Sequence, residues 1–434
     1  MAYMTPGVYV EEIAALPPSV AEVSTAIPAF IGTTAKGRAE TVEVAQISSV
    51  LEYQERFGRA SATEFTANAD DSIAPAPLAP GKALWYAINL YFRNGGGRCY
   101  VVSVDAEAAE LDAARFMAGL DALDLEDEPT LIVMPQAVSL AQADYDALNQ
   151  EALKRCAKLQ DRFALLDVKD GDVGKFRTGV LVDNLSYGAA YHPYLDTALV
   201  HVFDETTVTV KTAGADSKLS VIKSTDTQRY NRIKKNLSTQ RVTLPPSAAM
   251  AGVYARVDRE RGVWKAPANV GVMSVVGPAK RISFEQQAAL NVDPDTGKSI
   301  NALRDFPGRG TLVWGARTLA GNDNEWRYVP VRRLFIMVEE SAKKATAFAV
   351  FEPNDATTWL KVKGMLESYL YGLWENGALQ GATPEAAYYV SVGLGRTMRP
   401  QDVLEGRMIV EIGIAAVRPA EFIILRFSHM VATA

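Results

Sequence analysis

The chain has 434 residues, more than one hydrophobic core usually holds, so we expect two or three domains. Hydrophobic residues make up 48% and charged residues 22%, which is typical of globular proteins. The formal net charge of -6 argues against a dedicated nucleic-acid-binding protein, and no apolar run approaches the roughly 18 residues of a membrane span.

The first residues predict an extended arm over residues 1–23 rather than the start of a compact domain. Valine and tyrosine favour one short strand, whereas Pro6, Pro17 and Pro18 prevent a long one. An isolated strand cannot satisfy its own backbone groups, so it must pair with a sheet edge of the same or a neighbouring molecule. The start MAYMTPGVYVEE has neither the basic nor the apolar region of a secretory signal, so we expect a cytosolic product.

Residues 25–104 predict two core strands and two helices. TAIPAFIG (25–32) and residues 98–104 are apolar strand patterns, and a capping box of Ser49 and Glu52 starts a helix that ends at Phe57. A second helix over residues 82–93 stops at the glycines 95–97. A phosphate-binding loop is disfavoured there, because these glycines follow a helix and precede a strand. Cys99 and Cys156 have no paired-cysteine motif and are expected to be buried thiols.

Helical and strand patterns alternate over residues 111–168, which favours an α/β layer with parallel strands. Ser139 and Gln142 predict a capping box for the helix over residues 140–159. Residues 199–203 and 206–211 are further strand patterns. Residues 213–236 are polar without periodicity, which predicts a linker or exposed loop.

The stretch 245–376 contains the longest helical patterns. Helices are predicted over residues 245–258 and 283–290, followed by a polar surface loop whose Asp293 to Ser299 matches neither a phosphate loop nor a calcium loop. A strand at Thr311–Trp314 precedes two helical segments over residues 331–376, and Asp355 is the N-cap of the second. The second helix has one apolar face, formed by Trp359, Val362, Leu366, Tyr369, Leu370, Leu373 and Trp374.

The last part of the chain predicts strands at residues 386–392 and 408–417, in the same sheet as Thr311–Trp314, and a final strand at residues 422–427 behind Pro419. No histidine pair, serine elbow or nucleophilic cysteine motif occurs, so no catalytic, cofactor-binding or metal-binding residues are predicted.

Several motifs, in their order along the chain, resemble the contractile tail sheath family, which covers contractile phage tails, R-type pyocins and extracellular contractile injection systems. They are PGVYVEE (6–12), LWYAINLYFRNGGGRCYVV (84–102), YHPYL (191–195), LPPSAAMAGVYARVDRERGVWKAPAN (244–269), GRGTLVWGARTLA (308–320), VPVRRLF (329–335), FEPND (351–355) followed by TTW (357–359), and RPAEFIILRF (418–427). The similarity spans nearly the whole chain.

The resemblance implies a multi-domain, mixed α/β sheath subunit. Its expected domains are an N-terminal arm (1–23), a core region (24–104 and 237–300), an outer, more variable domain (105–236), a tube-facing domain (301–417) and a C-terminal arm (418–434). The arm strands that would pair with neighbouring subunits are Val8, Tyr9, Val10, Glu11, Glu12, Phe422, Ile423, Ile424, Leu425, Arg426 and Phe427. Candidate tube-facing residues are Lys361, Lys363 and Glu367.

The same resemblance implies the function and the partners. Such a subunit polymerises with itself into a helix around an inner tube protein. The helix is expected to consist of stacked hexameric rings. Baseplate and terminal cap proteins complete the particle, which is assembled in the bacterial cytoplasm and contracts to drive the tube through a target envelope. No enzyme activity, nucleic acid, cofactor or membrane insertion is expected.

Two other classes of protein remain open at this stage. A soluble α/β enzyme acting on a phosphorylated small molecule would explain the alternating elements and glycine turns, but it needs a pocket with convergent polar groups. A capsid-like shell protein would also exchange arms, but it would form closed particles.

Overall fold

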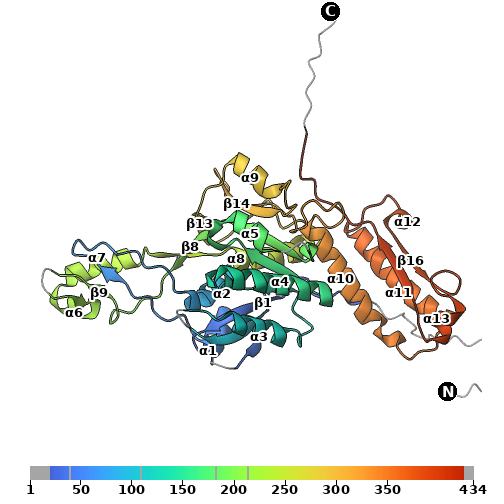
Figure 1. Ribbon diagram of the computed structural model, residues 1–434, viewed down its shortest axis with the longest axis horizontal. Helices are drawn as coiled ribbons and strands as arrows, with labels where there is room; N and C mark the ends of the chain where they lie inside the picture. The colour runs from blue at the N-terminus through green and yellow to red at the C-terminus, as the bar shows by residue number, and fades with distance from the viewer. Residues whose placement is uncertain (1–19, 39–40, 108–109, 181–182, 213–214, 425–434) are drawn as a thin grey trace, which may run out of the picture. The chain divides into compact units, whose positions relative to one another are not determined.

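The computed structural model describes residues 20–38, 41–107, 110–180, 183–212 and 215–424. The chain divides into two compact units. Unit 1 comprises residues 338–417 and the described residues up to Val23, and unit 2 comprises residues 24–337 and the described residues from Arg418 onward. Figure 1 shows the helices and strands of both units.

Unit 2 is built on a nine-stranded sheet, counted over the described residues, with the order β12-β15-β14-β7-β6-β5-β1-β4-β2. The six strands from β14 to β4 in this order are parallel to their neighbours. At the edges, β15, β12 and β2 are joined by antiparallel pairing. The parallel strands are apolar runs because both of their faces are covered, and all of β1 is buried. The strands are β1 (Pro28–Thr34), β2 (Glu43–Ile47), β4 (Cys99–Ala106), β5 (Leu131–Val133), β6 (Phe163–Asp167), β7 (Gly188–His192), β12 (Val270–Gly271), β14 (Ile300–Phe306) and β15 (Gly310–Trp314).

Helices pack on this sheet in pairs. α2 (Ala83–Arg93) packs on α8 (Ser247–Arg261), and α3 (Ala113–Leu123) packs on α4 (Gln142–Leu159). The α2–α8 pair is close, because a Cβ on Gly252 would lie 2.5 Å from the carbonyl oxygen of Tyr91. The mixed α/β fold expected from the sequence is thus confirmed. Further elements of unit 2 are α1 (Val50–Phe57), α5 (Val173–Gly179), β8 (Leu195–Val200), β11 (Arg241–Leu244), β13 (Val275–Pro278) and α9 (Phe284–Asn291).

Most of the predicted helix starts are correct, and one is wrong. Ser49 caps α1 by accepting a hydrogen bond from the Glu52 N–H, but the Glu52 carboxylate accepts from the Ser48 N–H, so only half of the predicted capping box forms. The capping box predicted at Ser139 does not form, because α4 begins after Ala141, which provides no side-chain cap. Cys99 and Cys156 are buried free thiols, as predicted.

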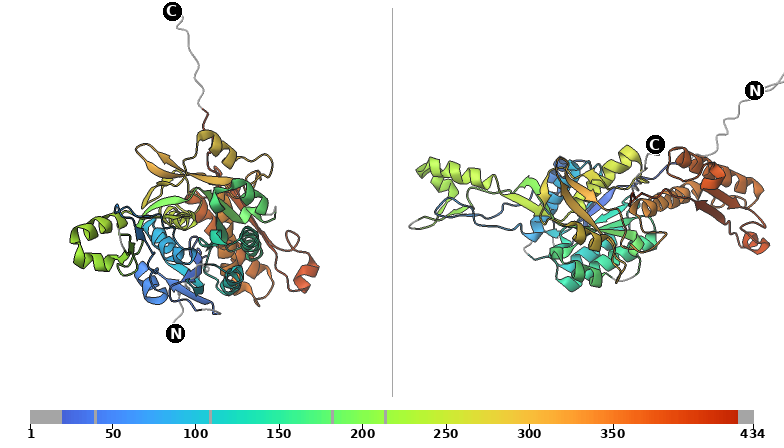
Figure 2. Two further views of the ribbon diagram at one scale, coloured as in Figure 1. Left: turned by 60° about the vertical axis from the view of Figure 1, so that its left-hand side comes forward. Right: turned by 90° about the horizontal axis from the view of Figure 1, so that it is seen from above.

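A small lobe of unit 2 has its own core, and the prediction for its helices was wrong. The segment predicted as a loop, residues 213–236, contains α6 (Leu219–Thr225) and most of α7 (Thr227–Leu237). Asp226 caps α7, and Tyr230, Ile233 and Leu237 point into the lobe core from one face. Their spacing is helical, but polar residues surround each of them in the sequence. Figures 1 and 2 show α6 and α7 set apart from the helices that cover the large sheet. The lobe strands are β3 (Thr66–Ala67), β9 (Thr209–Val210) and β10 (Ser217–Lys218).

Unit 1 consists of helices packed on a sheet of two strands. Its helices are the C-terminal part of α10 (Val329–Thr346), α11 (Ala356–Glu375), α12 (Pro384–Ala387) and α13 (Pro400–Leu404). As predicted, Asp355 caps α11, and it accepts hydrogen bonds from the N–H groups of Thr357 and Thr358. The strands β16 (Tyr388–Val392) and β17 (Val410–Ile414) form a sheet of their own. The prediction that they share a sheet with β15 is therefore wrong.

The expected domain ranges and the compact units divide the chain differently. Within residues 105–236, β5, β6 and β7 lie in the middle of the large sheet, whereas α6 and α7 belong to the lobe. Within residues 301–417, β14 and β15 belong to unit 2, and the change of unit falls inside α10. The alternation of helical and strand patterns in the sequence predicts an α/β layer. The order of the strands in the sheet, which the alternation does not predict, decides which segments share a core.

Asp167 makes the stability of unit 2 depend on pH. Its buried carboxylate, at the end of β6, accepts hydrogen bonds from the Ser247 N–H at 2.8 Å and the Ser247 hydroxyl at 2.6 Å. Burial raises the pKa of Asp167 to about 7, although the bonds from Ser247 lower it. The unfolded pKa is about 3.9. Because the folded pKa is the higher one, the stabilising contribution of this group is fully present below about pH 4 and is lost as the pH rises through about 7.

We therefore expect the melting temperature of the wild type to fall between about pH 4 and about pH 7, and Asp167→Asn to flatten that fall. Differential scanning calorimetry across this pH range is the measurement. Asp183→Asn, on the surface, is the matched control. Identical pH profiles of the two variants would contradict the prediction.

Candidate assembly surfaces

The small sheet of unit 1 has open edges. β16 and β17 pair in antiparallel register, from Tyr388 opposite Ile414 to Val392 opposite Val410. Over the described residues, no third strand joins this sheet. A sheet of two strands is marginally stable alone, and an unpaired edge is a template for an added strand. The sheet thus offers the backbone groups that an incoming strand needs.

The helix α11 supports this sheet with its predicted apolar face. Val362, Leu366, Leu370 and Leu373 are buried, together with Met365, which was not predicted. Trp359 and Trp374 lie half-buried at the margins of the face. Their indole N–H groups donate to the side-chain oxygen of Asn354 and the carbonyl of Gly381.

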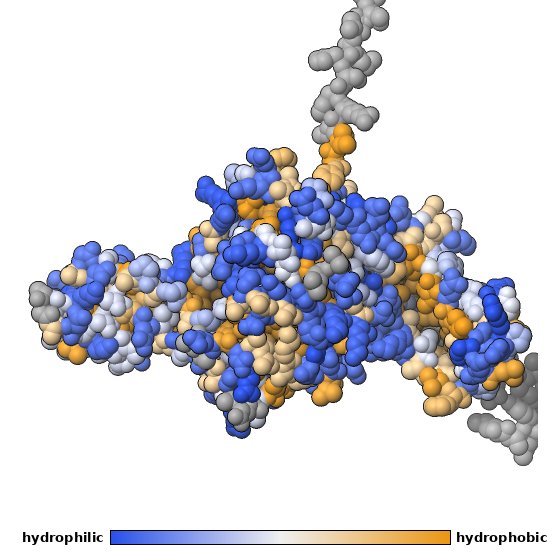
Figure 3. Space-filling model, viewed as in Figure 1, coloured by the Kyte–Doolittle hydropathy of each residue, from blue (hydrophilic) through white to orange (hydrophobic). Residues whose placement is uncertain are grey.

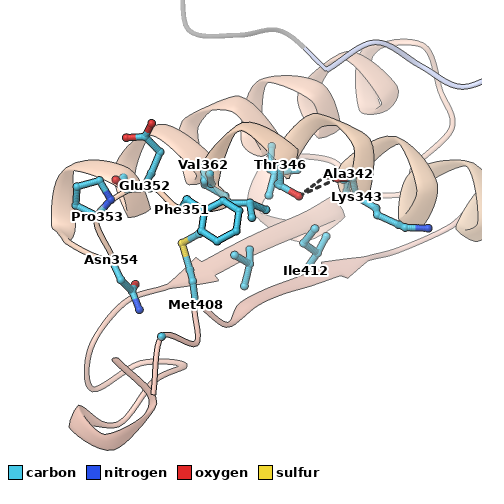
Figure 4. A pocket seen from close by; sticks show the side chains of 16 residues that line it. Ala342, Lys343, Thr346, Phe351, Glu352, Pro353, Asn354, Val362, Met408 and Ile412 are labelled. Atoms are coloured by element: carbon cyan, nitrogen blue, oxygen red, sulfur yellow. Dashed lines mark hydrogen bonds between the residues drawn. The ribbon is translucent and has the colours of Figure 1, made fainter. Parts of the chain in front are cut away.

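A mainly apolar pocket of about 720 Å³ opens beside β17. Figure 4 shows Val362, Phe351, Met408 and Ile412 around it, from α11, the loop before α11 and the region of β17. Phe351 is fully exposed and has a left-handed backbone, with φ of 69°. Both features are unfavourable for a bulky apolar residue in water. The pocket and Phe351 together are what a binding surface for apolar side chains requires.

The candidate tube-facing residues lie outside the buried face of α11, with Lys361 on one flank and Lys363 and Glu367 on the other. Lys361 is exposed, whereas Lys363 and Glu367 are half-buried and form an ion pair with each other at 3.5 Å. Such an i, i+4 pair contributes only about 0.3–0.5 kcal/mol. The structure therefore brings two of the three residues together and leaves the ammonium group of Lys361 at the surface.

The C-terminal arm begins at a carboxylate anchor in unit 2. Glu421 accepts hydrogen bonds from Arg317, from the Asn291 side chain at 2.6 Å and from the Tyr328 hydroxyl at 3.2 Å. Burial alone would raise the pKa of Glu421, but the bonds from Arg317 and Asn291 hold it below its usual range. Nearby, Arg418 donates to the carbonyl of Asn324 at 2.7 Å.

Beyond this anchor the chain exposes apolar side chains. Phe422, Ile423 and Ile424 are 70%, 79% and 76% exposed and form no strand within the single chain. Figure 3 shows these last described residues as hydrophobic surface next to the grey trace. Leu425, Arg426 and Phe427 lie outside the described residues. Exposed apolar residues in a row are typical of a segment that another protein surface covers.

The N-terminal arm also begins at a charged cluster. In unit 2, Arg333 pairs with Asp258 at 2.5 Å and donates to the carbonyl of Thr25, whose hydroxyl donates to Asp258. In unit 1, the N–H of Val23 donates to Ser341. The predicted arm strand of Val8, Tyr9, Val10, Glu11 and Glu12 lies outside the described residues.

The motifs that suggested ligand chemistry have structural roles. The loop at Asp293 to Ser299 was predicted to be at the surface, but Asp293 and Lys298 are buried, with exposures of 7% and 5%. The ammonium of Lys298 donates to the carbonyls of Arg177 and Val180, so it is not available to a phosphate. The described residues contain no group of three potential metal ligands and no helix long and apolar enough to cross a membrane.

Open strand edges, an apolar pocket beside one edge and anchored chain ends are the features of a structural subunit that assembles with other chains. Comparisons with known proteins agree. Residues 107–319 match the phage tail sheath protein central domain, and residues 321–429 match the phage tail sheath C-terminal domain. The chain belongs to the contractile tail sheath family, as the sequence motifs predicted.

Individual relatives support the assignment over the whole chain. A chain in the cryo-EM structure of the anti-feeding prophage (AFP) baseplate is 34% identical, with coverage of 99% of this chain and 100% of that chain and a TM-score of 0.70. A chain of the PVC sheath complex, an extracellular contractile injection system in the contracted state, is 32% identical, with 99% of both chains covered and a TM-score of 0.68. The predicted class of function, a structural subunit of a contractile sheath, is thereby confirmed.

The tail sheath protein of one phage is a longer protein than this chain. The tail sheath protein of Vibrio phage KVP40 is 24% identical over 185 residues, which are 42% of this chain and 26% of the phage protein. The chain therefore matches about a quarter of that relative's length.

Proposed function

We propose that copies of this chain polymerise into a helical sheath around an inner tube, and that contraction of the sheath drives the tube through a target envelope. The observation that carries the proposal is the combination, in one chain, of exposed apolar arm residues and a small sheet with open edges. Each copy would donate strands and accept them. Such contacts join different surfaces, so they extend into an open helix instead of closing on themselves.

The finer partners follow from the same reasoning. The AFP relative is part of a 6-fold symmetrised baseplate assembly, which supports hexameric rings and a baseplate partner for this chain. The inner tube would meet unit 1, with Lys361 as an exposed charge of α11, and a cap protein would close the far end. Assembly in the bacterial cytoplasm, with later release as part of a tail or particle, fits this architecture. A coupling of only about 1–3 kcal/mol per subunit would add up over a long polymer, so contraction needs no nucleotide.

The open edge of β17 is the acceptor that we propose for an arm, with its apolar side chains in the adjacent pocket. Ile412 lines this pocket. The variant Ile412→Lys is expected to lower the amount of sedimentable polymer at least about tenfold, because a desolvated ammonium opposes apolar contact. Glu411→Lys is the control, since neighbouring residues of a strand point to opposite faces. Equal polymer yields from the two variants would argue against the pocket as the acceptor.

Electron microscopy of the purified chain, expressed alone and with its genomic neighbours, tests the proposal as a whole. We expect hollow, helically striated tubes, with a thinner tube inside when its partner is present. Compact particles under every condition, or closed shells, would overturn it. A phosphate-dependent enzyme finds no support in the apolar pocket of unit 1 or in the buried Lys298.

A further inference from the structure

Two arginine clamps in unit 2 hold the chain where the arms begin. At the C-terminal clamp, the Arg317 Nε and Nη2 atoms donate to both carboxylate oxygens of Glu421, at 3.0 Å and 2.6 Å. The remaining Nη1 donates to the carbonyls of Asn291 and Gly321. Arg317 is only 4% exposed, so its charge depends on these partners. The two-pronged geometry fixes both the position and the direction of the chain at Glu421.

The C-terminal clamp is joined to the large sheet. The backbone N–H of Arg317 donates to the Asn301 side chain at 2.8 Å, and that side chain donates back to the Arg317 carbonyl at 2.8 Å. Asn301 belongs to β14, and it also donates to the carbonyl of Ala190 in β7. A pull on Glu421 therefore passes through Arg317 and Asn301 into two neighbouring strands.

The N-terminal clamp repeats this design with different residues. Arg333 donates through both terminal nitrogens to the two carboxylate oxygens of Asp258, at 3.0 Å and 2.5 Å. Its guanidinium also lies over the ring of Tyr254, 4.5 Å from the centroid. The chain held here is Thr25, just before β1, and Asp258 and Tyr254 belong to α8, which contacts β5 and β6.

Both arginines come from one short stretch of the chain. Arg317 forms a bridge with Tyr328, and α10 begins at Val329 and contains Arg333. The chain passes between the two units next to Ser24, within α10 and next to Arg418. The stretch from Arg317 to Arg333 therefore contacts or contains the unit 2 residues close to each of these three points.

We infer that Arg317 and Arg333 are positioning residues that fix the points at which the two arms leave unit 2 and transfer the load on each arm into the large sheet. The inference rests on the proposed exchange of arms between copies. It deepens that proposal by stating which contacts make an arm a tether rather than a loose tail. If the hydrogen bonds of a clamp are broken, the first residues of that arm move when the arm is under tension. The spacing between neighbouring copies is then no longer fixed.

The C-terminal clamp can be tested in the unpolymerised, full-length chain. Cys99 and Cys156 are buried, so a spin label on Ile423→Cys reports motion two residues beyond Glu421. We expect Glu421→Gln to shorten the rotational correlation time of this label several-fold and to lower the yield of sedimentable polymer. Glu43→Gln is the control, because Glu43 pairs with Arg56 at 2.7 Å on the surface, away from the arm.

Two further variants make each outcome decisive. Glu421→Asp keeps the charge and should restore part of the slow motion. The double variant Arg317→Met with Glu421→Gln leaves no unpaired buried charge, so it should fold even if the single variant does not, and its label should still move fast. Slow motion in a folded double variant would overturn the clamp. A wild-type chain with slow label motion that forms no polymer would instead overturn the proposed function.

Discussion

Removal of either arm is expected to abolish polymerisation while the rest of the chain stays folded. The two deletions are residues 1–20 and all residues after Glu421. The second keeps Glu421, so Arg317 retains its partner and the folded units lose no described contact of the anchor. A copy that lacks an arm can still accept a strand from a neighbour, but it cannot donate the missing strand to the next copy. The polymer therefore cannot grow beyond that contact.

The measurement combines sedimentation and electron microscopy with circular dichroism and thermal unfolding of the truncated chains. Melting temperatures within a few degrees of the wild type, together with a loss of polymer of at least about a hundredfold, are the expected result. A mixture of the two truncated chains should form at most short oligomers. Normal tubes from either truncation would refute the role of that arm.

The second large effect is expected at the N-terminal clamp. Asp258→Ala removes the partner of Arg333, whose side chain is only 3% exposed, and leaves a buried guanidinium with uncompensated charge. Breaking a buried ion pair in this way typically costs about 3–5 kcal/mol. The carbonyl of Thr25 and the ring of Tyr254 remain as partners, which places the expected loss at the lower end of that range.

Urea unfolding of the unpolymerised chain, followed by a probe in unit 2, measures this loss. The double variant Asp258→Ala with Arg333→Met should recover most of the lost free energy of unfolding, since it removes the unpaired charge. Asp121→Ala is the control, because Asp121 is a surface partner of Arg155 with a 69% exposed side chain. Equal losses in Asp258→Ala and in the control would show that the pair contributes no more than a surface contact.

Much of the fold could be predicted from the sequence, because its helices and buried strands have strong local signals. The Asp355 cap, the apolar face of α11 and the glycine stop after α2 depend on residues close together in the chain, and the structure confirms them. The lobe helices were missed because Tyr230, Ile233 and Leu237 are isolated among charged residues. Their burial depends on partners such as Phe65, far away in the sequence.

The candidate site could be predicted only in part. The arms have recognisable motifs, but their pairing depends on other copies of the chain. The pocket beside β17 combines Thr346, Phe351 and Met408 from separate segments, and no local pattern indicates that they meet. Glu421 and Arg317 are 104 positions apart, so their pairing could not be inferred from spacing. An isolated carboxylate after a proline, within an otherwise apolar run, is the one signal that could have suggested an anchor.

The burial of both cysteines has a consequence for the redox environment that an assembled particle can tolerate. Burial raises the pKa values of Cys99 and Cys156, so neither thiol forms the thiolate that reacts with oxidants or disulfides. Copies packed side by side therefore cannot become cross-linked through these residues, either in a reducing cytoplasm or in an oxidising medium. If copies of this chain form the proposed polymer, no disulfide through Cys99 or Cys156 would lock its subunits together.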